Sequence, residues 1–201
     1  MDGGIDRAKR TLRTRMARLL ASQSEIHVER ASTAIVTAVT ALPELARARA
    51  VGLYAALSGE PDLRPVFEAV LAAGRRGFFP RCRTDGVLDF VPISRWEDLE
   101  SGRYGVLEPG SALAADPESA IDLVLVPGVA FDRTGGRLGR GRGYYDKTLA
   151  QAPLCSALRV GVAFACQLEY AVPAGPLDVS MDVLVTEQGP IRVAGERVAR
   201  R

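Results

Sequence analysis

The most constraining feature of the sequence is residues 121–126, Ile-Asp-Leu-Val-Leu-Val, a nearly unbroken apolar run that stops at Pro127-Gly128. Such a run is typical of a strand at the centre of a parallel sheet that helices cover on both faces. Shorter runs with strand character occur at 50–55, 77–79, 87–91, 159–163 and 181–186. Because a helical pattern spans 62–74 between two of these runs, the alternation predicts an α/β fold with a mostly parallel central sheet flanked by helices.

Two helices are expected before the first strand, within residues 1–45. Apolar residues recur at helical spacing from about residue 5 to residue 20. A second helix is predicted to begin at Ser22, because Ser22 and Glu25 have the spacing of a capping box. Pro43 is predicted to end this helix, since proline cannot continue one.

Length and composition predict one globular domain over residues 1–201. The 47% hydrophobic and 25% charged residues are ordinary for a soluble protein. Residues 94–117 are rich in glycine and proline and are predicted to form an ordered loop, and the tail at 190–201 is expected to fray. No stretch of about 18 apolar residues and no secretory signal occurs, so we expect a cytoplasmic protein with no membrane partner.

Charge and cysteine usage exclude further classes. The 26 basic and 24 acidic residues leave a net charge of +2, too balanced for a protein that depends on nucleic-acid phosphates. We therefore expect no nucleic-acid partner. We further expect small-molecule partners and a monomer. Cys82, Cys155 and Cys166 form no CxxC pair, which argues against a disulfide framework or a zinc site. Each cysteine is expected to be a small buried hydrophobic residue.

The segment with the clearest chemistry is residues 135–146, Gly-Gly-Arg-Leu-Gly-Arg-Gly-Arg-Gly-Tyr-Tyr-Asp. Its five glycines allow positive φ and expose backbone N–H groups, its arginines add positive charge, and a predicted helix begins at Tyr144. Such a turn suits a polyphosphate. Asp146 would be badly placed beside phosphates unless Mg²⁺ lay between them. Equally, Asp146 could simply neutralise a neighbouring arginine, and the residues alone leave both readings open.

Known phosphate motifs do not fit this segment. GxxxxGK[ST] is absent, and the glycine spacing differs from that of the dinucleotide fingerprint GxGxxG. A string of glycine and arginine could also contact RNA. On its own, the segment predicts phosphate binding and no particular reaction.

Residues 126–132 followed by 137–146 resemble the signature of the 5-formyltetrahydrofolate cyclo-ligase family. The resemblance spans most of the chain, through weaker matches at 9–13, Tyr54, Glu60, 80–81, 105–109, 161–164, Gln167, 178–182 and 186–187. It implies a ligase that forms a cyclic C–N bond, converting 5-formyltetrahydrofolate to 5,10-methenyltetrahydrofolate. The implied route is ATP-driven phosphorylation of the formyl oxygen and ring closure, with Mg²⁺ as cofactor, ATP as co-substrate, and release of ADP and phosphate.

The resemblance also implies residue roles. Catalytic roles fall on Arg140, Tyr144 and Asp146. ATP binding falls on Lys9, Arg13, Arg137, Leu138, Gly139, Arg140, Gly141, Arg142, Gly143, Tyr144 and Tyr145. Substrate binding falls on Tyr54, Glu60, Tyr104, Arg140, Gly141, Arg142, Gly143 and Tyr144. Asp146 and Asp178 are implied as the magnesium ligands.

Other readings of the same residues stay open at this point. Lys9 and Arg13 could form a solvated basic helix face, and Tyr54 could be a core residue. Arg142 stands where many family members carry glycine. The whole chain could be an ATP-binding relative acting on another small molecule, or a non-enzymatic nucleotide- or RNA-binding module.

Overall fold

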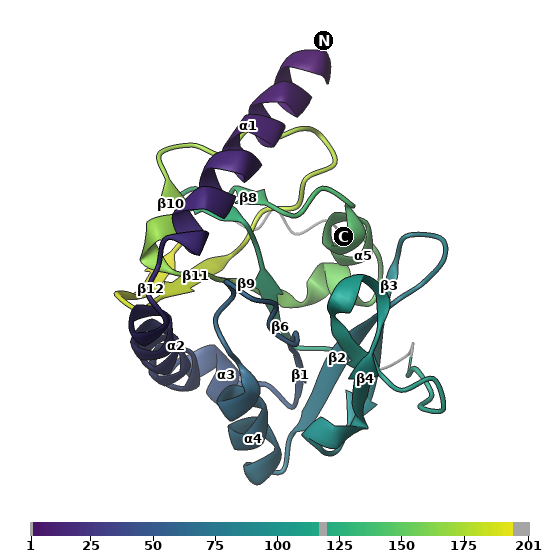
Figure 1. The fold of residues 1–201 in the computed structure, drawn as a ribbon. Coiled ribbons are helices and arrows are strands. Elements are labelled where there is room, and N and C mark those ends of the chain that lie inside the picture. Colours follow the sequence, from purple (N-terminus) through teal and green to yellow (C-terminus); the bar gives the residue numbers. More distant parts are fainter. Residues whose placement is uncertain (1, 117–119, 195–201) are drawn as a thin grey trace.

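The centre of the molecule, in a computed structural model that describes residues 2–116 and 120–194, is a seven-stranded sheet (Figure 1). Its strand order is β12-β11-β9-β6-β1-β2-β3. The strands are β1 (Ala50–Gly52), β2 (Arg76–Cys82), β3 (Leu88–Ile93), β6 (Leu123–Pro127), β9 (Leu158–Val162), β11 (Val183–Thr186) and β12 (Gly189–Arg192). The most apolar run of the sequence forms β6, in the middle of this order.

Strands β2, β1, β6, β9 and β11 are parallel, while β3 and β12 pair antiparallel at the two edges. The predicted mostly parallel sheet, with residues 121–126 at its centre, is confirmed. From β1 the chain crosses to β2 on one side, and the later strands β6, β9 and β11 are added on the other side. Strand order therefore reverses between β1 and β6, and ligands of open α/β sheets bind outside the carboxyl ends of the strands at such a point.

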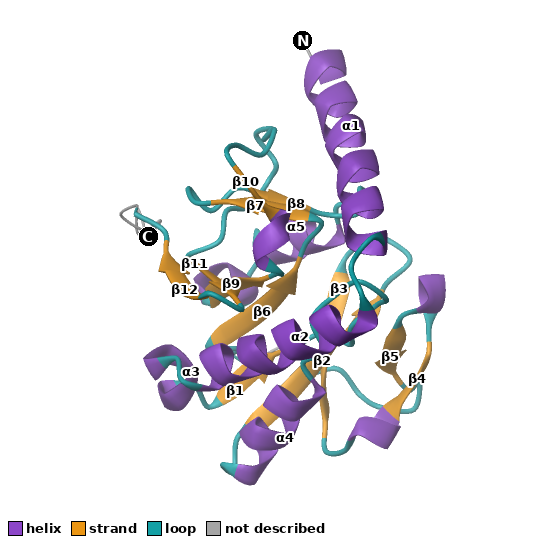
Figure 2. Cartoon of the chain, turned by 60° about the vertical axis from the view of Figure 1, so that its left-hand side comes forward, coloured by secondary structure: helices purple, strands orange, loops and turns teal. Residues whose placement is uncertain are grey.

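Helices cover both faces of the sheet (Figure 2). They are α1 (Asp2–Ala21), α2 (Glu25–Thr40), α3 (Pro43–Arg47), α4 (Arg64–Ala72) and α5 (Tyr144–Leu149). Helix α2 contacts β11, β12 and α4, and α4 contacts β2, whereas α5 contacts β3 from the other side. Helix α1 extends beyond the rest of the molecule at its N-terminal end (Figure 1). None of the helices in the described ranges combines the length and apolar character that a membrane span needs.

Two smaller sheets and four short 3₁₀ turns lie outside the central sheet in the part of the chain that the structure describes. A three-stranded sheet contains β7 (Ala130–Asp132), β8 (Arg137–Leu138) and β10 (Leu168–Glu169), and a two-stranded sheet pairs β4 (Leu99–Ser101) with β5 (Leu107–Pro109). Short 3₁₀ turns occupy Trp96–Asp98, Arg103–Gly105, Leu154–Ser156 and Ala165–Gln167. The sequence predicted a loop at 94–117, but this segment contains a two-stranded sheet.

Alternation along β6 explains how its residues serve two cores. Leu123 and Leu125 belong to the apolar cluster under α2 and α4, whereas Val124 and Val126 belong to the cluster on the other face with Leu149 of α5. Successive side chains of a strand point to opposite faces, so a strand between two helical layers must be apolar throughout.

Several predicted helix boundaries were wrong. Ser24, rather than Ser22, caps α2, because its Oγ accepts a hydrogen bond from the His27 N–H at 3.3 Å. Ser22 instead donates its hydroxyl to the Leu19 carbonyl at the end of α1. Pro43 does not end α2 but begins α3, a position where its missing N–H costs nothing.

The strand-like runs at 77–79 and 87–91 are each followed by a proline, Pro80 and Pro92, and a proline there is expected to stop the strand, but both prolines lie inside strands. Pro80 is part of β2, beyond the residues that pair with β1, so its missing N–H faces no strand on that side. Pro92 is part of β3, an edge strand, where proline is tolerated.

Two further predictions need correction. Cys155 is exposed, and Cys82 and Cys166 are only half-buried, so the expectation of three buried cysteines was wrong. Residues 190–192 of the predicted frayed tail form β12 paired with β11. The remainder of the tail from residue 195 lies outside the described residues.

Candidate functional site

A cavity of about 470 Å³ opens where the carboxyl ends of β1, β2 and β6 meet. Tyr54 follows β1, Cys82 ends β2, and Pro127 and Gly128 end β6, and all four line this cavity. Every residue predicted for ATP, substrate or magnesium also lines it: Lys9, Arg13, Tyr54, Glu60, Tyr104, Arg137, Leu138, Gly139, Arg140, Gly141, Arg142, Gly143, Tyr144, Tyr145, Asp146 and Asp178. Residues from distant parts of the sequence therefore converge at the topological switch point.

Helix α1 brings two cations to the cavity. Lys9 and Arg13 are one helical turn apart and lie on the same face of α1. Lys9 Nζ forms an ion pair with Asp178 Oδ2 at 2.5 Å, and Arg13 Nε donates to the Gly139 carbonyl at 2.9 Å. A small apolar cluster anchors the helix here, formed by Leu12, Met16, Ala130, Leu138 and Val172. The two basic residues are thus fixed at the cavity rather than left on a solvated face.

A second ion pair lies next to the first. Arg137 Nη2 donates to Asp146 Oδ1 at 2.8 Å, and the Val179 N–H donates to the same oxygen at 3.2 Å. Only 3% of the Arg137 side chain and 17% of the Asp146 side chain are exposed. Since Val179 follows Asp178, the Asp146 carboxylate lies beside the segment that carries Asp178, and both side chains line the cavity. We call Lys9, Arg137, Asp146 and Asp178 the ion-pair cluster.

Asp146 thus neutralises an arginine, one of the two readings that the sequence left open. It also lines the same cavity as Asp178, the other predicted magnesium ligand. Burial on its own raises the pKa of Asp178, but hydrogen bonds from Lys9 and the Gly175 N–H outweigh it and leave that pKa lowered. The Asp178 carboxylate therefore stays ionised at neutral pH and available to a cation.

Two glycines in the turn before α5 adopt conformations that other residues rarely take. Gly141 has φ +102° and Gly143, the N-cap of α5, has φ +72°. A Cβ at Gly141 would lie 3.2 Å from the guanidinium carbon of Arg13, so the turn also needs the space. Helix α5 has only six residues, so its dipole contributes little positive charge and the arginines and Lys9 supply most of it.

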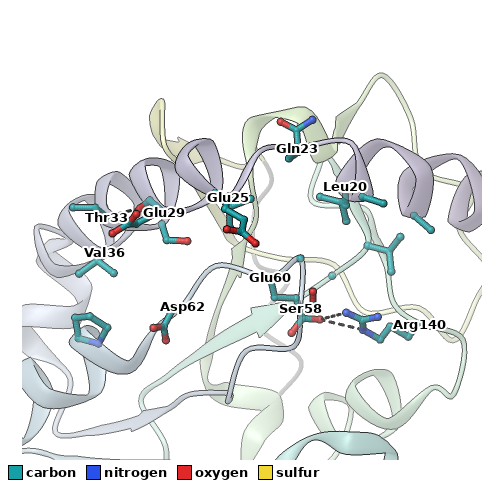
Figure 3. Close-up of a pocket in the computed structure, with 18 of the residues that line it drawn as sticks. Leu20, Gln23, Glu25, Glu29, Thr33, Val36, Ser58, Glu60, Asp62 and Arg140 are labelled. Atoms are coloured by element: carbon teal, nitrogen blue, oxygen red, sulfur yellow. Dashed lines mark hydrogen bonds and ion pairs between the residues drawn. The ribbon is translucent and has the colours of Figure 1, made fainter.

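Glu60 is held by the same turn. Arg140 donates to Glu60 Oε1 through Nη2 at 2.8 Å and Nε at 3.1 Å, as the dashed lines in Figure 3 mark. Glu60 Oε2 accepts from the Leu57 N–H at 3.0 Å. Both carboxylate oxygens of Glu60, which was predicted to bind substrate, therefore have hydrogen-bond partners.

The Glu60–Arg140 pair also borders a larger cavity of about 1010 Å³ between the end of α1, helix α2 and the loop at 58–62 (Figure 3). Apart from residues shared with the smaller cavity, its walls carry Glu25, Glu29 and Asp62 and aliphatic side chains of α1 and α2. Its charged lining is mostly acidic, which is unsuited to phosphates. We therefore assign the functional site to the smaller cavity.

Tyrosines form much of the remaining wall. Tyr104 has φ +62°, unusual for a residue other than glycine, and is 53% exposed, with the Arg142 guanidinium 3.7 Å from its ring centroid. The Tyr104 hydroxyl and burial raise the pKa of Tyr144. Burial, with the Glu60 charge, raises the pKa of both Tyr54 and Tyr145. These phenols stay protonated at neutral pH and can act as hydrogen-bond donors.

Unsatisfied polar atoms point to a ligand in this cavity. Among the residues that the structure describes, the buried side-chain atoms without a hydrogen-bond partner are Glu108 Oε1, Arg137 Nε and the Tyr145 hydroxyl, and all three residues line the cavity. Buried polar atoms are nearly always hydrogen-bonded, so this concentration is typical of a site that a ligand completes.

Glu108 and Cys82 are among the cavity residues for which the sequence predicted no role in binding. Glu108 is 7% exposed and Cys82 is half-buried. The segment 105–109 contributed to the family resemblance, but nothing assigned a role to its carboxylate. No local signal marked Glu108, because residues 94–117 were predicted to form a loop and only the fold buries its carboxylate.

Asp132, in the resemblance motif, holds the scaffold rather than the cavity. Its Oδ1 accepts from the N–H and hydroxyl of Thr134 and from the Gly136 N–H, and its Oδ2 accepts from the Val172 N–H. Gln167 similarly donates from Nε2 to the carbonyls of Gly128 and Val129 at the end of β6. Neither Asp132 nor Gln167 lines the cavity. These bonds fix the turn from which the arginines project.

Fold and cavity together define an α/β enzyme whose small-molecule site lies at the switch point of a mostly parallel sheet and is lined by ion pairs. The model of the 5-formyltetrahydrofolate cyclo-ligase family matches residues 5–187, most of the chain. The chain belongs to this family, and is accordingly a ligase.

Individual relatives agree with this membership. The chain is 30% identical to the 5-formyltetrahydrofolate cyclo-ligase of Escherichia coli K12 over 87% of this chain and 96% of that protein. The solved structure of 5,10-methenyltetrahydrofolate synthetase from Aquifex aeolicus is 32% identical, covers 96% of both chains and has a TM-score of 0.80. The synthetase structure from Mycoplasma pneumoniae shares the fold with a TM-score of 0.72 at 22% identity, covering 93% of this chain and 99% of that one.

Proposed function

We propose that this chain converts 5-formyltetrahydrofolate to 5,10-methenyltetrahydrofolate, using ATP with Mg²⁺ and releasing ADP and phosphate. The names of its relatives support the folate reaction. The observation that carries the ATP-dependent part is the ion-pair cluster, where two cations and two carboxylates lie together in one cavity with unsatisfied atoms of Arg137 and Tyr145.

The proposed chemistry turns the formyl oxygen into a leaving group. The bond between the γ-phosphorus of ATP and its bridging oxygen breaks as the formyl oxygen bonds to that phosphorus, and ADP departs. N10 of the folate then attacks the formyl carbon and loses its proton, and the carbon–oxygen bond breaks with its electrons going to phosphate. Such a transfer needs positioning and charge stabilisation more than covalent help from the protein.

The ion-pair cluster is suited to binding by exchange of partners. In the structure Lys9 and Arg137 neutralise Asp178 and Asp146. A magnesium triphosphate would bring both a dication for the carboxylates and anionic oxygens for Lys9 and Arg137. Each charged group would then keep an opposite charge, and the buried Arg137 Nε would gain the acceptor it lacks. Arg13 and Arg140 add positive charge along the same wall.

The carboxylates fit Mg²⁺ in type and number. Within the described residues no group of three or more His, Cys, Asp or Glu side chains could hold a metal alone. Mg²⁺ commonly takes one or two carboxylates and fills its other positions with phosphate oxygens and water, so Asp146 and Asp178 would hold it. Bound there, Mg²⁺ would neutralise charge on the triphosphate.

The direct test combines purified protein, Mg²⁺, ATP and 5-formyltetrahydrofolate, and follows the near-ultraviolet absorbance of the methenyl product. The sequence contains only two lysines, which supply a matched pair of variants. Lys9→Met is expected to reduce turnover at least about tenfold, since one charge-assisted contact of about 1.5–3 kcal/mol is lost. Lys147→Met, outside the cavity, is the control and is expected to behave as wild type.

Folded protein that consumes no 5-formyltetrahydrofolate at saturating ATP and Mg²⁺ would disprove the proposal. Release of phosphate from ATP without any methenyl product would instead identify an ATP-using relative with another substrate.

A further inference from the structure

Glu108 is a buried carboxylate that the reaction described so far does not use. It lies on β5 and lines the cavity. Its Oε2 accepts a hydrogen bond from the Cys82 N–H at 3.2 Å. Its Oε1 is buried and has no hydrogen-bond partner within the described ranges. A buried carboxylate oxygen without a donor is costly, so a donor from a ligand would stabilise it.

The surrounding chain leaves room for this side chain. A Cβ on Gly102, just beyond β4, would lie 2.5–2.8 Å from the Cβ, Cγ and Cδ atoms of Glu108. Any other residue at position 102 would therefore displace the carboxylate. Burial and the Glu108 carboxylate together raise the pKa of the Cys82 thiol to about 12, so that neighbour stays neutral.

Polarity separates Glu108 from the other unsatisfied atoms. Arg137 Nε is a donor and the Tyr145 hydroxyl can donate, so both suit the acceptor-only oxygens of a triphosphate. Glu108 Oε1 can only accept when ionised, so it needs a ligand group rich in N–H donors. Its surroundings are different too, because Cys82, Tyr104 and Tyr144 line the cavity with it, and Cys82 and Tyr104 both affect the pKa of Tyr144.

We propose that Glu108 determines folate specificity by accepting hydrogen bonds from the 2-amino group and N3–H of the pterin ring, an inference that rests on the proposed function. These two donors are adjacent on the aminopyrimidinone edge and match one carboxylate. Adenine presents its amino group next to the lone pair of N1, which repels a carboxylate. Glu60 is less suited to this task, since Arg140 and Leu57 already occupy its oxygens.

If Glu108 had only a structural role, the hydrogen bond from Cys82 to its Oε2 would suffice. Binding measurements with chemically different ligands separate this structural role from recognition of the pterin. Glu108→Gln keeps the size of the side chain but replaces one acceptor by a donor. Glu100→Gln is the matched control, because Glu100 pairs directly with Glu108 across β4 and β5 but is exposed and outside the cavity.

The experiment is equilibrium binding of 5-formyltetrahydrofolate and of ADP with Mg²⁺ by calorimetry, with thermal unfolding to verify folding. Glu108→Gln is expected to weaken folate binding by about tenfold or more, the effect of losing a hydrogen bond to a charged group, and to leave ADP binding unchanged. Glu100→Gln should match wild type for both ligands. An equal loss for both ligands, or no loss for folate, would overturn the assignment.

A modified ligand tests the contact without relying on the variant alone. An analogue of 5-formyltetrahydrofolate with methyl in place of the 2-amino group should bind wild type at least about tenfold more weakly, and Glu108→Gln should show little further discrimination. Wild type that binds both folates equally would refute the role of Glu108. Wild type that binds no folate at all would refute the proposed function instead.

Discussion

Asp146→Asn should lower stability as well as activity, because the partner of Asp146 is buried. Arg137 is 3% exposed, its Nε is unsatisfied, and its contact with Asp146 Oδ1 is 2.8 Å. The Nη1 contact with the Pro127 carbonyl, at 3.2 Å, is the longer of its hydrogen bonds. Removing the carboxylate charge therefore leaves a buried guanidinium without the carboxylate to which it donates directly.

The size of the effect follows from that geometry. Deleting one partner of a buried ion pair typically costs about 3–5 kcal/mol. Asparagine keeps an oxygen that can accept from Arg137, so we expect a smaller loss of about 1–3 kcal/mol in the free energy of unfolding. For a chain of this size each kcal/mol shifts Tm by roughly 2–4 °C, which gives a fall of about 2–12 °C.

Thermal and urea unfolding of Asp146→Asn, Arg137→Met and the double variant measure this prediction. The double variant has no unpaired charge and should lose less stability than the sum of the single changes, by about 1–3 kcal/mol. Asp85→Asn is the control, because Asp85 and its partner Arg83 are both about half exposed, and it should change Tm little. An unchanged Tm in Asp146→Asn, together with additive single effects, would refute the buried pair.

Three other perturbations test the site and the scaffold. ATP and Mg²⁺ are expected to bind with strong mutual dependence, since ATP alone would leave the carboxylates without a cation. Calorimetry should show weak ATP binding in EDTA and a smaller gain in ATP affinity from Mg²⁺ in Asp178→Asn. Equal ATP affinity with and without Mg²⁺ in wild type would contradict the exchange of partners. Burial on its own raises the pKa of Asp132, but hydrogen bonds from Thr134 and from the Val172 and Gly136 N–H groups outweigh it and leave that pKa lowered. The stability that these bonds add is therefore present above the unfolded pKa of about 3.9 and is lost as pH falls through the lower folded pKa. Between about pH 5 and 3, the free energy of urea unfolding should fall more steeply for wild type than for Asp132→Asn. Parallel curves for the two proteins would refute this role of Asp132. Leu125→Ala, at the fully buried centre of β6, should cost about 2–5 kcal/mol in urea unfolding. A loss below about 1 kcal/mol, smaller than the usual cost of a cavity left by a buried leucine, would argue against the central position of this strand.

The sheet could be predicted from the sequence where local pattern and tertiary demand coincide. Residues 123–126 are apolar throughout because β6 is covered on both faces, so the pattern alone revealed the place of this strand. Boundaries were less predictable. Pro80 and Pro92 stop strands only where a neighbouring strand needs their N–H, and the pairing partners are not visible in the local sequence.

The cavity residues also differ in how far the sequence alone could predict them. The glycine turn and its arginines predict an anion site from residue type alone. Lys9 and Asp178 do not, since 169 positions separate them and only the docking of α1 brings them within 2.5 Å. Glu108 could not be assigned because an unsatisfied oxygen is a property of the folded environment rather than of the residue.

The bonds of Asp132 have a consequence for how members of this family are recognised. Part of the motif that makes the chain recognisable secures the architecture of a turn and touches no cavity surface. A descendant that replaced Lys9 and Asp178 would keep that turn, would still fold, and would still match its relatives along most of its length. Catalytic competence in such a protein is therefore better judged from α1 and the carboxylate facing it than from the family's longest shared motif.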